Sequence, residues 1–577
     1  MGTGDVNGAG WRLHSASLGD LQARVDHALA EVMQADIASR IWARDHTVWK
    51  PEPKEISNRL GWLDTAEVMA GNVRRLRAFA EEARNAGYKK ALLFGMGGSS
   101  LAPEVFRKTY GVSDGFLDLA VLDSTDPGAV LAYARTMPPS ESLFIVSSKS
   151  GSTVEPLSLF KYFYNWVMDA VGRDQAGEHF VAITDPGSGL AALADKYRFR
   201  ATFLNDPNIG GRYSALSHFG LVPAALAGVD IGRVLESGVR AMNASRAQVP
   251  PRRNLGLWLG VVIGEAARAG RDKATFVLSP EMASFGDWLE QLLAESTGKE
   301  GTGVLPVVGE PLGNPEVYGS DRLFVQLRLW DDAGDDGALE AIEQAGHPVL
   351  RIWLRDTYDL GGQFFLWELA TAVAGQRLGI NPFDQPDVDS AKEKAREMAK
   401  AYSQTGALPA EQPAAAWGSI QGYGELAGDS PRDALRSFIA GARDPSYVSL
   451  QAYVQPTVET DASLASLRMA IRDESGLAVT VGYGPRFLHS TGQLHKGDAG
   501  RGLFIQLTAD DAQDAPIPDE AGSPASSLTF GVLKAAQAMG DRQALADAGR
   551  RVIRFHLGGD VVAGIRRLAG ARSERAA

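Results

Sequence analysis

The stretch Ala91-Leu-Leu-Phe-Gly-Met-Gly-Gly-Ser-Ser100 carries the pattern that decides the fold: a short uncharged apolar run that ends in small polar residues. The same pattern recurs at 119–126, at 143–153 and at 180–187. Each apolar run predicts a buried strand, and each is followed by a stretch with helical periodicity. Strands that alternate with helices form a parallel sheet covered by helices on both faces, so we predict a doubly wound α/β fold.

The alternation resumes beyond residue 253, with strand candidates at 275–278, 304–308, 323–329 and 349–354. Helical patterns lie at 283–294, 337–345, 361–377 and 386–402. The last third of the chain repeats part of this second unit: Asp321–Arg328 is similar to Arg501–Thr508, and Ala345–Ile352 is similar to Ala548–Phe555. This repetition predicts a third, degenerate α/β unit. The alternative is that short apolar strands resemble one another by chance.

Five segments follow from these patterns. We predict an N-terminal helical extension at 1–60, a first α/β domain at 61–250 and a second at 251–405. A linker rich in Ala, Gly, Gln and Pro is predicted at 406–439, and the third unit at 440–577.

Composition narrows the possible partners. The chain has 577 residues, 58 Lys and Arg against 70 Asp and Glu, and a net charge of −12, which disfavours a nucleic-acid partner. The absence of cysteine excludes disulfides and thiolate chemistry. No secretory signal is visible, and the most apolar run, at 255–263, is too short to span a bilayer. We therefore expect a soluble cytoplasmic protein without a membrane partner.

Two loops have the composition of a phosphate site. Ser148-Lys-Ser-Gly-Ser-Thr153 follows a strand and precedes a helix, so that hydroxyls and free amides gather at a helix N-terminus, where an anion is favoured. Gly97-Gly-Ser-Ser100 ends a neighbouring strand. Each loop alone is also compatible with a capped turn, but the pair favours phosphate binding. The glycine spacing fits neither a dinucleotide fingerprint nor a P-loop.

The two loops, in the context Phe94–Pro103 and Val146–Pro156, resemble the characteristic loops of the sugar isomerase (SIS) domain. Three further motifs, at 210–214, 291–299 and 381–392, resemble the phosphoglucose isomerase family and occur in the family's order. Within that family the chain is most similar to the isomerase half of bifunctional transaldolase/glucose-6-phosphate isomerase chains, although it shows no room for a transaldolase barrel. The resemblance implies tandem SIS domains, with the third unit SIS-like.

The resemblance implies a glucose-6-phosphate isomerase of glycolysis and gluconeogenesis, which converts glucose 6-phosphate and fructose 6-phosphate through a cis-enediol(ate). Glu295 would be the base, Arg212 would stabilise the enediolate, and Lys392 would assist ring opening. This chemistry needs a placed carboxylate and a fixed cation, and no metal or cofactor. The resemblance also implies a homodimer. The implied substrate-binding residues are Gly98, Ser99, Ser148, Lys149, Ser150, Thr153, Gln291 and Gln385.

The ring-opening histidine departs from the family pattern. Only His347 lies between Glu295 and Gln385, and it lacks the His-Ser-x-Gly-Gln context, which occurs instead at His489–His495 in the third unit. We hypothesise that the third unit docks so that His489 reaches the site, from the same chain or from a neighbouring subunit. The alternatives are that His489 is an ordinary loop residue or that His347 opens the ring.

Two other functions remain open. The enzyme could accept a further sugar, such as mannose 6-phosphate, or the chain could be a non-catalytic sugar-phosphate sensor. A sensor would need the phosphate loops but not Glu295, Gln291, Arg212 and Lys392 together, so their joint presence favours catalysis.

Overall fold

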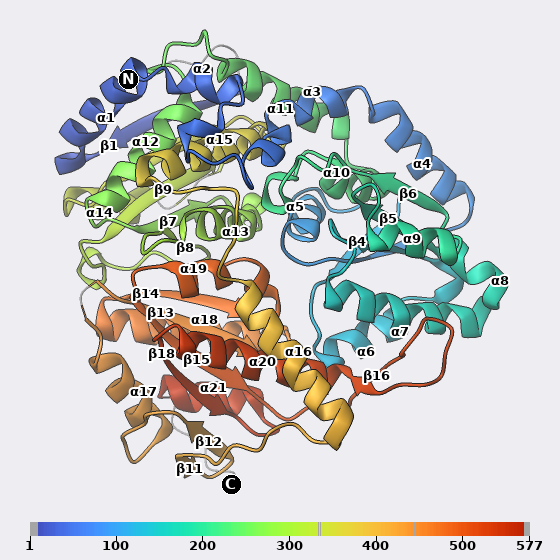
Figure 1. Cartoon of the computed structure of the whole chain (residues 1–577). Coiled ribbons are helices and arrows are strands. Elements are labelled where there is room, and N and C mark those ends of the chain that lie inside the picture. Colours follow the sequence, from blue (N-terminus) through green and yellow to red (C-terminus); the bar gives the residue numbers. More distant parts are fainter. Residues whose placement is uncertain (1–9, 333, 335, 444, 571–577) are drawn as a thin grey trace.

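The computed structural model describes residues 10–332, 334, 336–443 and 445–570. Three main sheets, each built largely of parallel strands and covered by helices, make up the molecule (Figure 1). The predicted α/β class is therefore confirmed. In the described part of the chain, no helix is both long and apolar enough to cross a membrane.

The first unit contains a five-stranded parallel sheet of order β3-β2-β4-β5-β6. Its strands are uncharged in the middle because both faces of the sheet are covered. The strands are β2 (Lys90–Phe94), β3 (Asp118–Leu122), β4 (Ser142–Ser147), β5 (Phe180–Thr184) and β6 (Ala201–Leu204). The helices are α3 (Thr65–Ala70), α4 (Val73–Asn85), α5 (Leu101–Tyr110), α6 (Pro127–Thr136), α7 (Val154–Val171), α8 (Arg173–Ala176), α9 (Gly189–Lys196), α10 (His218–Leu226) and α11 (Ile231–Ala244).

The second unit has the sheet order β1-β10-β9-β7-β8, in which β1 (Trp11–Ser17) is antiparallel to its neighbour. Within the predicted N-terminal helical extension at 1–60, residues 11–17 instead form this strand, in which Trp11 and Leu13 are buried on alternate positions. The other strands are β7 (Lys273–Leu278), β8 (Leu305–Val307), β9 (Arg322–Leu329) and β10 (Val349–Leu354). The helices are α1 (Gln22–Gln34), α2 (Ile37–Trp42), α12 (Leu255–Arg268), α13 (Phe285–Thr297), α14 (Asp336–Gln344) and α15 (Leu360–Leu378).

The third unit has the sheet order β11-β12-β18-β15-β13-β14. Its first two strands and one helix lie within the predicted linker at 406–439, which is therefore structured, with Ile420 and Tyr423 buried. The strands are β11 (Ala415–Trp417), β12 (Ile420–Tyr423), β13 (Tyr447–Tyr453), β14 (Ala478–Tyr483), β15 (Gly502–Thr508) and β18 (Arg551–His556), with a separate hairpin of β16 (Pro516–Ile517) and β17 (Leu528–Thr529). The helices are α17 (Pro431–Ala440), α18 (Val458–Ser475), α19 (Gly492–Gly497), α20 (Phe530–Asp547) and α21 (Val561–Ala569).

The third sheet repeats the topology of the second. The order β8-β7-β9-β10 corresponds to β14-β13-β15-β18, and each series ends against an antiparallel strand, β1 or β12. The register also corresponds, since Phe324 pairs with Thr275 and Val349, while Phe504 pairs with Ser449 and Val552.

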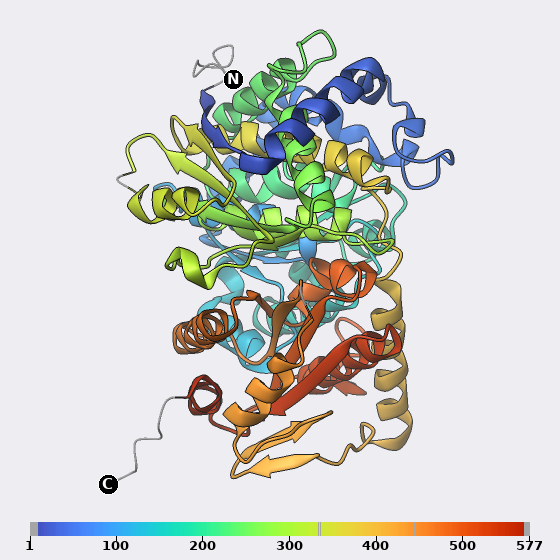
Figure 2. The same cartoon turned by 90° about the vertical axis from the view of Figure 1, so that its left-hand side faces the viewer.

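The third unit docks below the other two, and α16 (Asp389–Thr405) runs along its side (Figure 2). This helix was predicted as the end of the second domain, but it packs on α20 of the third. The packing is close: a Cβ on Gly540 would lie 2.7 Å from the backbone nitrogen of Ala395. Lys394 Nζ also lies 2.6 Å from a carboxylate oxygen of Asp547.

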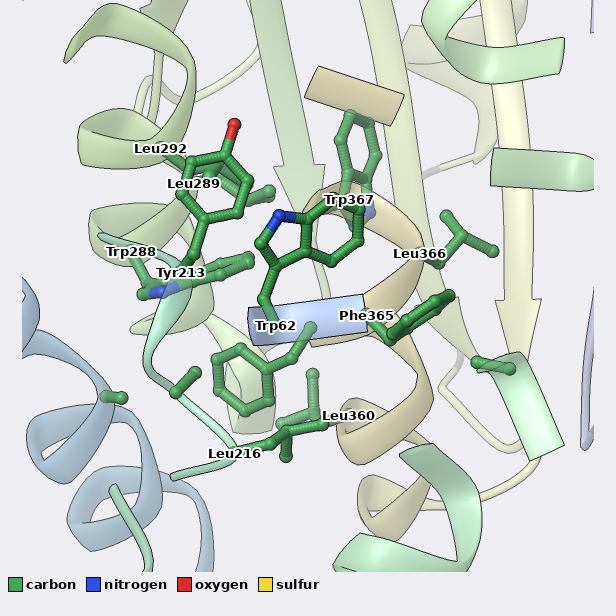
Figure 3. Close-up of a cluster of buried hydrophobic side chains, with 14 of the residues drawn as sticks. Trp62, Tyr213, Leu216, Trp288, Leu289, Leu292, Leu360, Phe365, Leu366 and Trp367 are labelled. Atoms are coloured by element: carbon green, nitrogen blue, oxygen red, sulfur yellow. The ribbon is translucent and has the colours of Figure 1, made fainter. Parts of the chain in front are cut away.

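A large apolar core joins the first and second units. Trp62, Trp288 and Trp367 are almost fully buried in it, among aromatic and leucine side chains of α13 and α15 (Figure 3). Nearly every residue of α13 is buried, including its polar residues Gln291 and Glu295. Burying a polar side chain without a hydrogen-bond partner costs free energy of folding. Gln291 and Glu295 are therefore expected to have polar partners inside the core.

Candidate active site

The two hydroxyl-rich loops meet at the carboxyl ends of adjacent strands. β2 leads into the turn Gly97–Ser99, and β4 leads into residues 148–153 before α7 begins at Val154. The loops contact directly, since Ser147 Oγ donates to the carbonyl oxygen of Ser99 at 2.9 Å. Within the second loop Ser148 Oγ donates to Thr153 Oγ1 at 3.2 Å, and the hydroxyls of Ser150 and Ser152 lie 2.9 Å apart.

Gly98 sits where no side chain fits. A Cβ there would lie 1.9 Å from the carbonyl oxygen of Gly211, in the loop that carries Arg212. The absence of a side chain at Gly98 therefore lets the turn Gly97–Ser99 approach the turn that carries Arg212.

Lys149 does not add free positive charge to the loop, contrary to the prediction. Its Nζ forms an ion pair with Asp185 and donates to the carbonyl oxygen of Pro207 at 2.9 Å. A second cation, Arg212, lies in the loop that Gly98 contacts.

Glu295 and Arg212 form a buried pair at the centre of the site. Arg212 Nη1 lies 3.4 Å from Glu295 Oε1, and Gln291 Nε2 donates to Glu295 Oε2 at 2.9 Å. Arg212 is fixed from its other side, since Nε donates to Ser296 Oγ at 2.7 Å and Nη2 donates to the Pro382 carbonyl at 2.7 Å. Both charged groups are therefore held in place before any substrate binds, which is the preorganisation that charge stabilisation needs.

The loop at 381–388 closes over this pair. Gln385 is exposed, and its Oε1 accepts from Arg212 Nη1 at 3.4 Å. The loop is tied to the end of α13 by Lys299, whose Nζ lies 2.7 Å from Asp384 Oδ1 and 2.6 Å from the Asp384 carbonyl. Burial and the nearby Arg212 lower the pKa of Lys299 to about 8. This lysine belongs to the 291–299 motif, but its anchoring contact was not predicted.

His489 of the same chain reaches the site from the third unit. It ends the 3₁₀ turn Arg486–His489, and its carbonyl oxygen accepts from Gln291 Nε2 at 2.8 Å. Its ring Nε2 lies 3.0 Å from Glu155 Oε1. Gln291 thus contacts both the carboxylate of Glu295 and the backbone of His489.

The other histidines lie elsewhere. His347 packs edge-on against Tyr318 and Phe324, and burial lowers its pKa. His495 is buried in the third unit within 3.4 Å of Ser449 and Gln451. Burial lowers the pKa of His218 to about 4. Of the two histidines proposed for ring opening, the structure brings only His489 to the predicted residues.

Glu155 is the site residue that the sequence analysis missed. It is buried in the first turn of α7, with Oε1 shared between His489 and Gln537 Nε2, the latter at 2.7 Å. Burial acts to raise its pKa, but the charge and hydrogen bond of His489 outweigh that effect and the pKa is lowered. Glu155 stands in the Val146–Pro156 motif, but acidic residues are common in first helical turns, so its presence there did not indicate a role in the site.

Lys392 lies in the first turns of α16, half-buried. Its charge acts to lower the pKa of Glu155. The sequence motifs of all three units thus meet in one region through Gly98, Arg212, Gln291, Glu295, Gln385 and His489.

The structure thus combines paired α/β units, hydroxyl-rich loops, a buried carboxylate–arginine pair and a carboxylate–histidine pair, an arrangement compatible with a phosphosugar isomerase. Comparison with known proteins agrees. Residues 63–306 match the family model of phosphoglucose isomerase, so the chain carries a phosphoglucose isomerase domain over that range. The predicted family and enzyme class are thereby confirmed. The range includes the two loops, Arg212, Gln291 and Glu295, but not Gln385, Lys392 or His489.

Two curated relatives illustrate the similarity. The chain is 29% identical over 392 residues to a glucose-6-phosphate isomerase of Thermus thermophilus, in a match that covers 59% of this chain and 91% of that protein. It is 28% identical over 285 residues to a glucose-6-phosphate isomerase of Parabacteroides distasonis, covering 42% of this chain and 64% of that protein. These matches do not test the finer resemblance to bifunctional chains.

Two solved structures share the fold. A hypothetical protein of Thermus thermophilus has a TM-score of 0.58 and 25% identity, covering 66% of this chain and 99% of that one. A glucose-6-phosphate isomerase of Chlamydia trachomatis also has a TM-score of 0.58, with 18% identity, covering 69% of this chain and 89% of that one.

Proposed function

We propose that this protein interconverts glucose 6-phosphate and fructose 6-phosphate, with Glu295 as the base that moves a proton between C2 and C1. The observation that carries the proposal is the buried Glu295 carboxylate, held at 3.4 Å from Arg212 and 2.9 Å from Gln291. The relatives named glucose-6-phosphate isomerase and the phosphoglucose isomerase family model support the choice of sugar.

The phosphate of the sugar would bind the two hydroxyl-rich loops. The hydroxyls of Ser99, Ser148, Ser150 and Thr153 lie at the N-terminal end of α7 or beside it, where the helix dipole favours an anion. Binding energy from this remote group would orient C1 and C2 toward Glu295.

Ring opening would fall to the pair of His489 and Glu155, with Lys392 close by. A histidine that is hydrogen-bonded to a carboxylate can take the proton of the anomeric hydroxyl and return a proton to the ring oxygen. Glu295 would then remove the proton at C2, and Arg212 would stabilise the negative charge that develops on the enediolate. This reaction moves protons within the sugar and needs no metal or cofactor.

One chain supplies both groups. Glu295 belongs to the second unit and His489 to the third, which repeats the second, so each unit has kept a different part of the machinery. The homodimer implied by the family resemblance is therefore not required to bring His489 to Glu295.

A coupled assay of fructose 6-phosphate conversion to glucose 6-phosphate, with EDTA present, tests the proposal. We expect Glu295→Gln to lower kcat by about 10³-fold and His489→Ala by about 10²-fold, as for a lost general base or acid. Matched controls are Glu281→Gln, an exposed glutamate just before α13, and His347→Ala. Both controls should keep wild-type turnover.

Three results would contradict this assignment. Full activity of Glu295→Gln would exclude it as the base. Loss of activity in His347→Ala but not in His489→Ala would move ring opening to His347. A wild-type protein that binds the sugar phosphate without turnover would be a sensor or an isomerase of another sugar, for which mannose 6-phosphate is the next substrate to assay.

A further inference from the structure

A chain of buried hydrogen bonds leads from the first unit through the third unit to Glu155. Thr125 Oγ1 donates to Gln537 Oε1 at 2.7 Å, and Gln537 Nε2 donates to Glu155 Oε1 at 2.7 Å. The same carboxylate oxygen lies 3.0 Å from His489 Nε2. Thr125, Gln537 and Glu155 are each at most 3% exposed, so water cannot replace any of these contacts easily.

The partners of Gln537 fix which way its amide points. The hydroxyl of Thr125 can donate to the amide oxygen, and the carboxylate of Glu155 can only accept from the amide nitrogen. A flipped amide would place its oxygen against the carboxylate, with two acceptors facing each other. The network therefore has one favourable orientation, in which the amide nitrogen of Gln537 donates to Oε1 of Glu155.

The helix that carries Gln537 is anchored one turn earlier. Lys534 Nζ lies 2.8 Å from Asp126 Oδ2 and also forms an ion pair with Asp511. Asp126 follows Thr125 in the chain and caps α6 of the first unit. α20 is thus held on the loop after β3 by two buried contacts, and its register relative to Glu155 is set.

We propose that Gln537 is a positioning residue, which holds the carboxylate of Glu155 in the orientation that His489 needs for ring opening. The inference deepens the proposed function and rests on it. Oε2 of Glu155 is buried and has no hydrogen-bond partner among the described residues, so Oε1 carries both of the side chain's contacts. Without Gln537 the carboxylate would lose one of the two side-chain hydrogen bonds to Oε1, so its orientation toward His489 would be less well defined.

This role separates ring opening from proton transfer. Gln537 contacts Glu155, whereas Glu295 is held by Arg212 and Gln291. Replacing Gln537 should therefore slow the exchange of the α and β anomers of glucose 6-phosphate, which requires only opening and closing of the ring. Proton transfer at C2 from an open-chain sugar should be spared.

The experiment compares Gln537→Leu with Gln543→Leu in the full chain. Gln543 lies on the same helix but is exposed and bonds only Asp547 in the described structure, so it controls for changes to α20. Anomer exchange is measured by exchange NMR on glucose 6-phosphate, and isomerisation by the coupled assay. We expect Gln537→Leu to slow anomer exchange by about 10- to 100-fold, as for the loss of one hydrogen bond to a charged group, with KM little changed. Gln543→Leu should match the wild type.

A second variant tests the pH dependence of anomer exchange, which would not change if Gln537 only stabilised the fold. Gln537→Glu keeps the shape but sets one carboxylate against another, so its anomer exchange should recover at low pH, where one of the two binds a proton. If Gln537→Leu does not fold, as judged by circular dichroism, Thr125→Val replaces it. That variant removes the donor that orients Gln537 and should slow anomer exchange several-fold.

The outcomes distinguish this inference from the proposed function. Wild-type anomer exchange in folded Gln537→Leu, with an unchanged pH profile in Gln537→Glu, would overturn the positioning role. A wild type that exchanges anomers but does not isomerise would overturn the proposed function, while the effect of Gln537 could still be measured. A wild type with neither activity would overturn both.

Discussion

Two glutamates of α13, five positions apart, lie in opposite electrostatic environments. Glu295 faces the guanidinium of Arg212, with Oε1 at 3.4 Å from Nη1. Glu290 is half-buried near Asp287, and burial together with that like charge raises its pKa to about 8. One helix thus carries a carboxylate paired with a cation and, on another side, a carboxyl group that is protonated at neutral pH.

The raised pKa of Glu290 predicts a pH dependence of stability. The folded state binds this proton more tightly than the unfolded chain, whose pKa is near 4.5. The stabilisation is therefore complete below about pH 4.5 and is lost as pH rises toward 8. Glu290→Gln should remove about 4 kcal/mol of the fall in unfolding free energy between about pH 5 and about pH 8.5. Urea unfolding at both pH values measures it, and an equal fall in wild type and variant would contradict it.

At the scale of residues, the sequence predicted side chains that belong to recognisable motifs. The structure brings Arg212, Gln291 and Glu295 together, and it adds His489 from a motif displaced by almost two hundred positions. Glu155 and Gln537 could not be predicted in the same way. Their significance depends on which groups face them after three units have docked. Glu155 stands in the Val146–Pro156 motif without a predicted role there, and Gln537 stands in no distinctive local pattern.

At the scale of elements, the loop between β2 and α5 is built around Gly97. Its backbone has φ +55°, and a Cβ there would lie 2.6 Å from Gln291 Nε2 and 2.7 Å from the carbonyl oxygen of His489. The glycine therefore allows a phosphate-type loop, a helix of the second unit and the histidine loop of the third to meet within contact distance.

Gly97→Ala should lower activity through this contact. We expect kcat to fall by about 10-fold or more, because Gln291 and His489 must move apart to admit the methyl group. Gly87→Ala is the matched control: its φ is +92°, but a Cβ there meets nothing within 4 Å. Both variants should lose about 1 kcal/mol of stability from the left-handed backbone, and only Gly97→Ala should lose turnover. Equal activities in the coupled assay would show that this close approach is not needed.

Many of the apolar parallel strands were predictable, and the antiparallel strands were not. The runs at 91–94, 143–146 and 349–354 each coincide with a strand to within a residue or two, because a buried parallel strand must be apolar on both faces. β1, β11 and β12 pair antiparallel to their neighbours, and the partners β10 of β1 and β18 of β12 are distant in the sequence. No local pattern identifies such a partner.

At the scale of the molecule, a buried charge cluster joins the second and third units. Glu310 of the second unit is fully buried and lies 3.4 Å from Arg322 and 3.8 Å from both Arg468 and Arg472 of α18. The two α18 arginines also donate across the junction, to the carbonyls of Val308 at 2.8 Å and Pro311 at 2.6 Å. Burial lowers the pKa of Arg468 to about 10, and the neighbouring charges of Arg322 and Arg472 act in the same direction.

Removing that carboxylate should weaken the docking of the third unit. Glu310→Gln leaves three buried arginines without their common counter-charge, so we expect a loss of about 3–5 kcal/mol in unfolding free energy. Asp473→Asn is the matched control, because Asp473 pairs with Arg472 from a position that is 50% exposed. Urea unfolding of both variants, followed together with isomerase activity, measures the effect.

The two readouts should change in a definite order. His489 is carried by the third unit and Glu295 by the second, so partial undocking separates them before either unit unfolds. In Glu310→Gln we therefore expect activity to disappear at a lower urea concentration than the loss of helical circular dichroism. In the wild type and in Asp473→Asn the two transitions should coincide more closely. Coincident transitions in Glu310→Gln would mean that the third unit unfolds together with the rest of the chain. The charge cluster would then stabilise the whole chain and not specifically the contact between the second and third units.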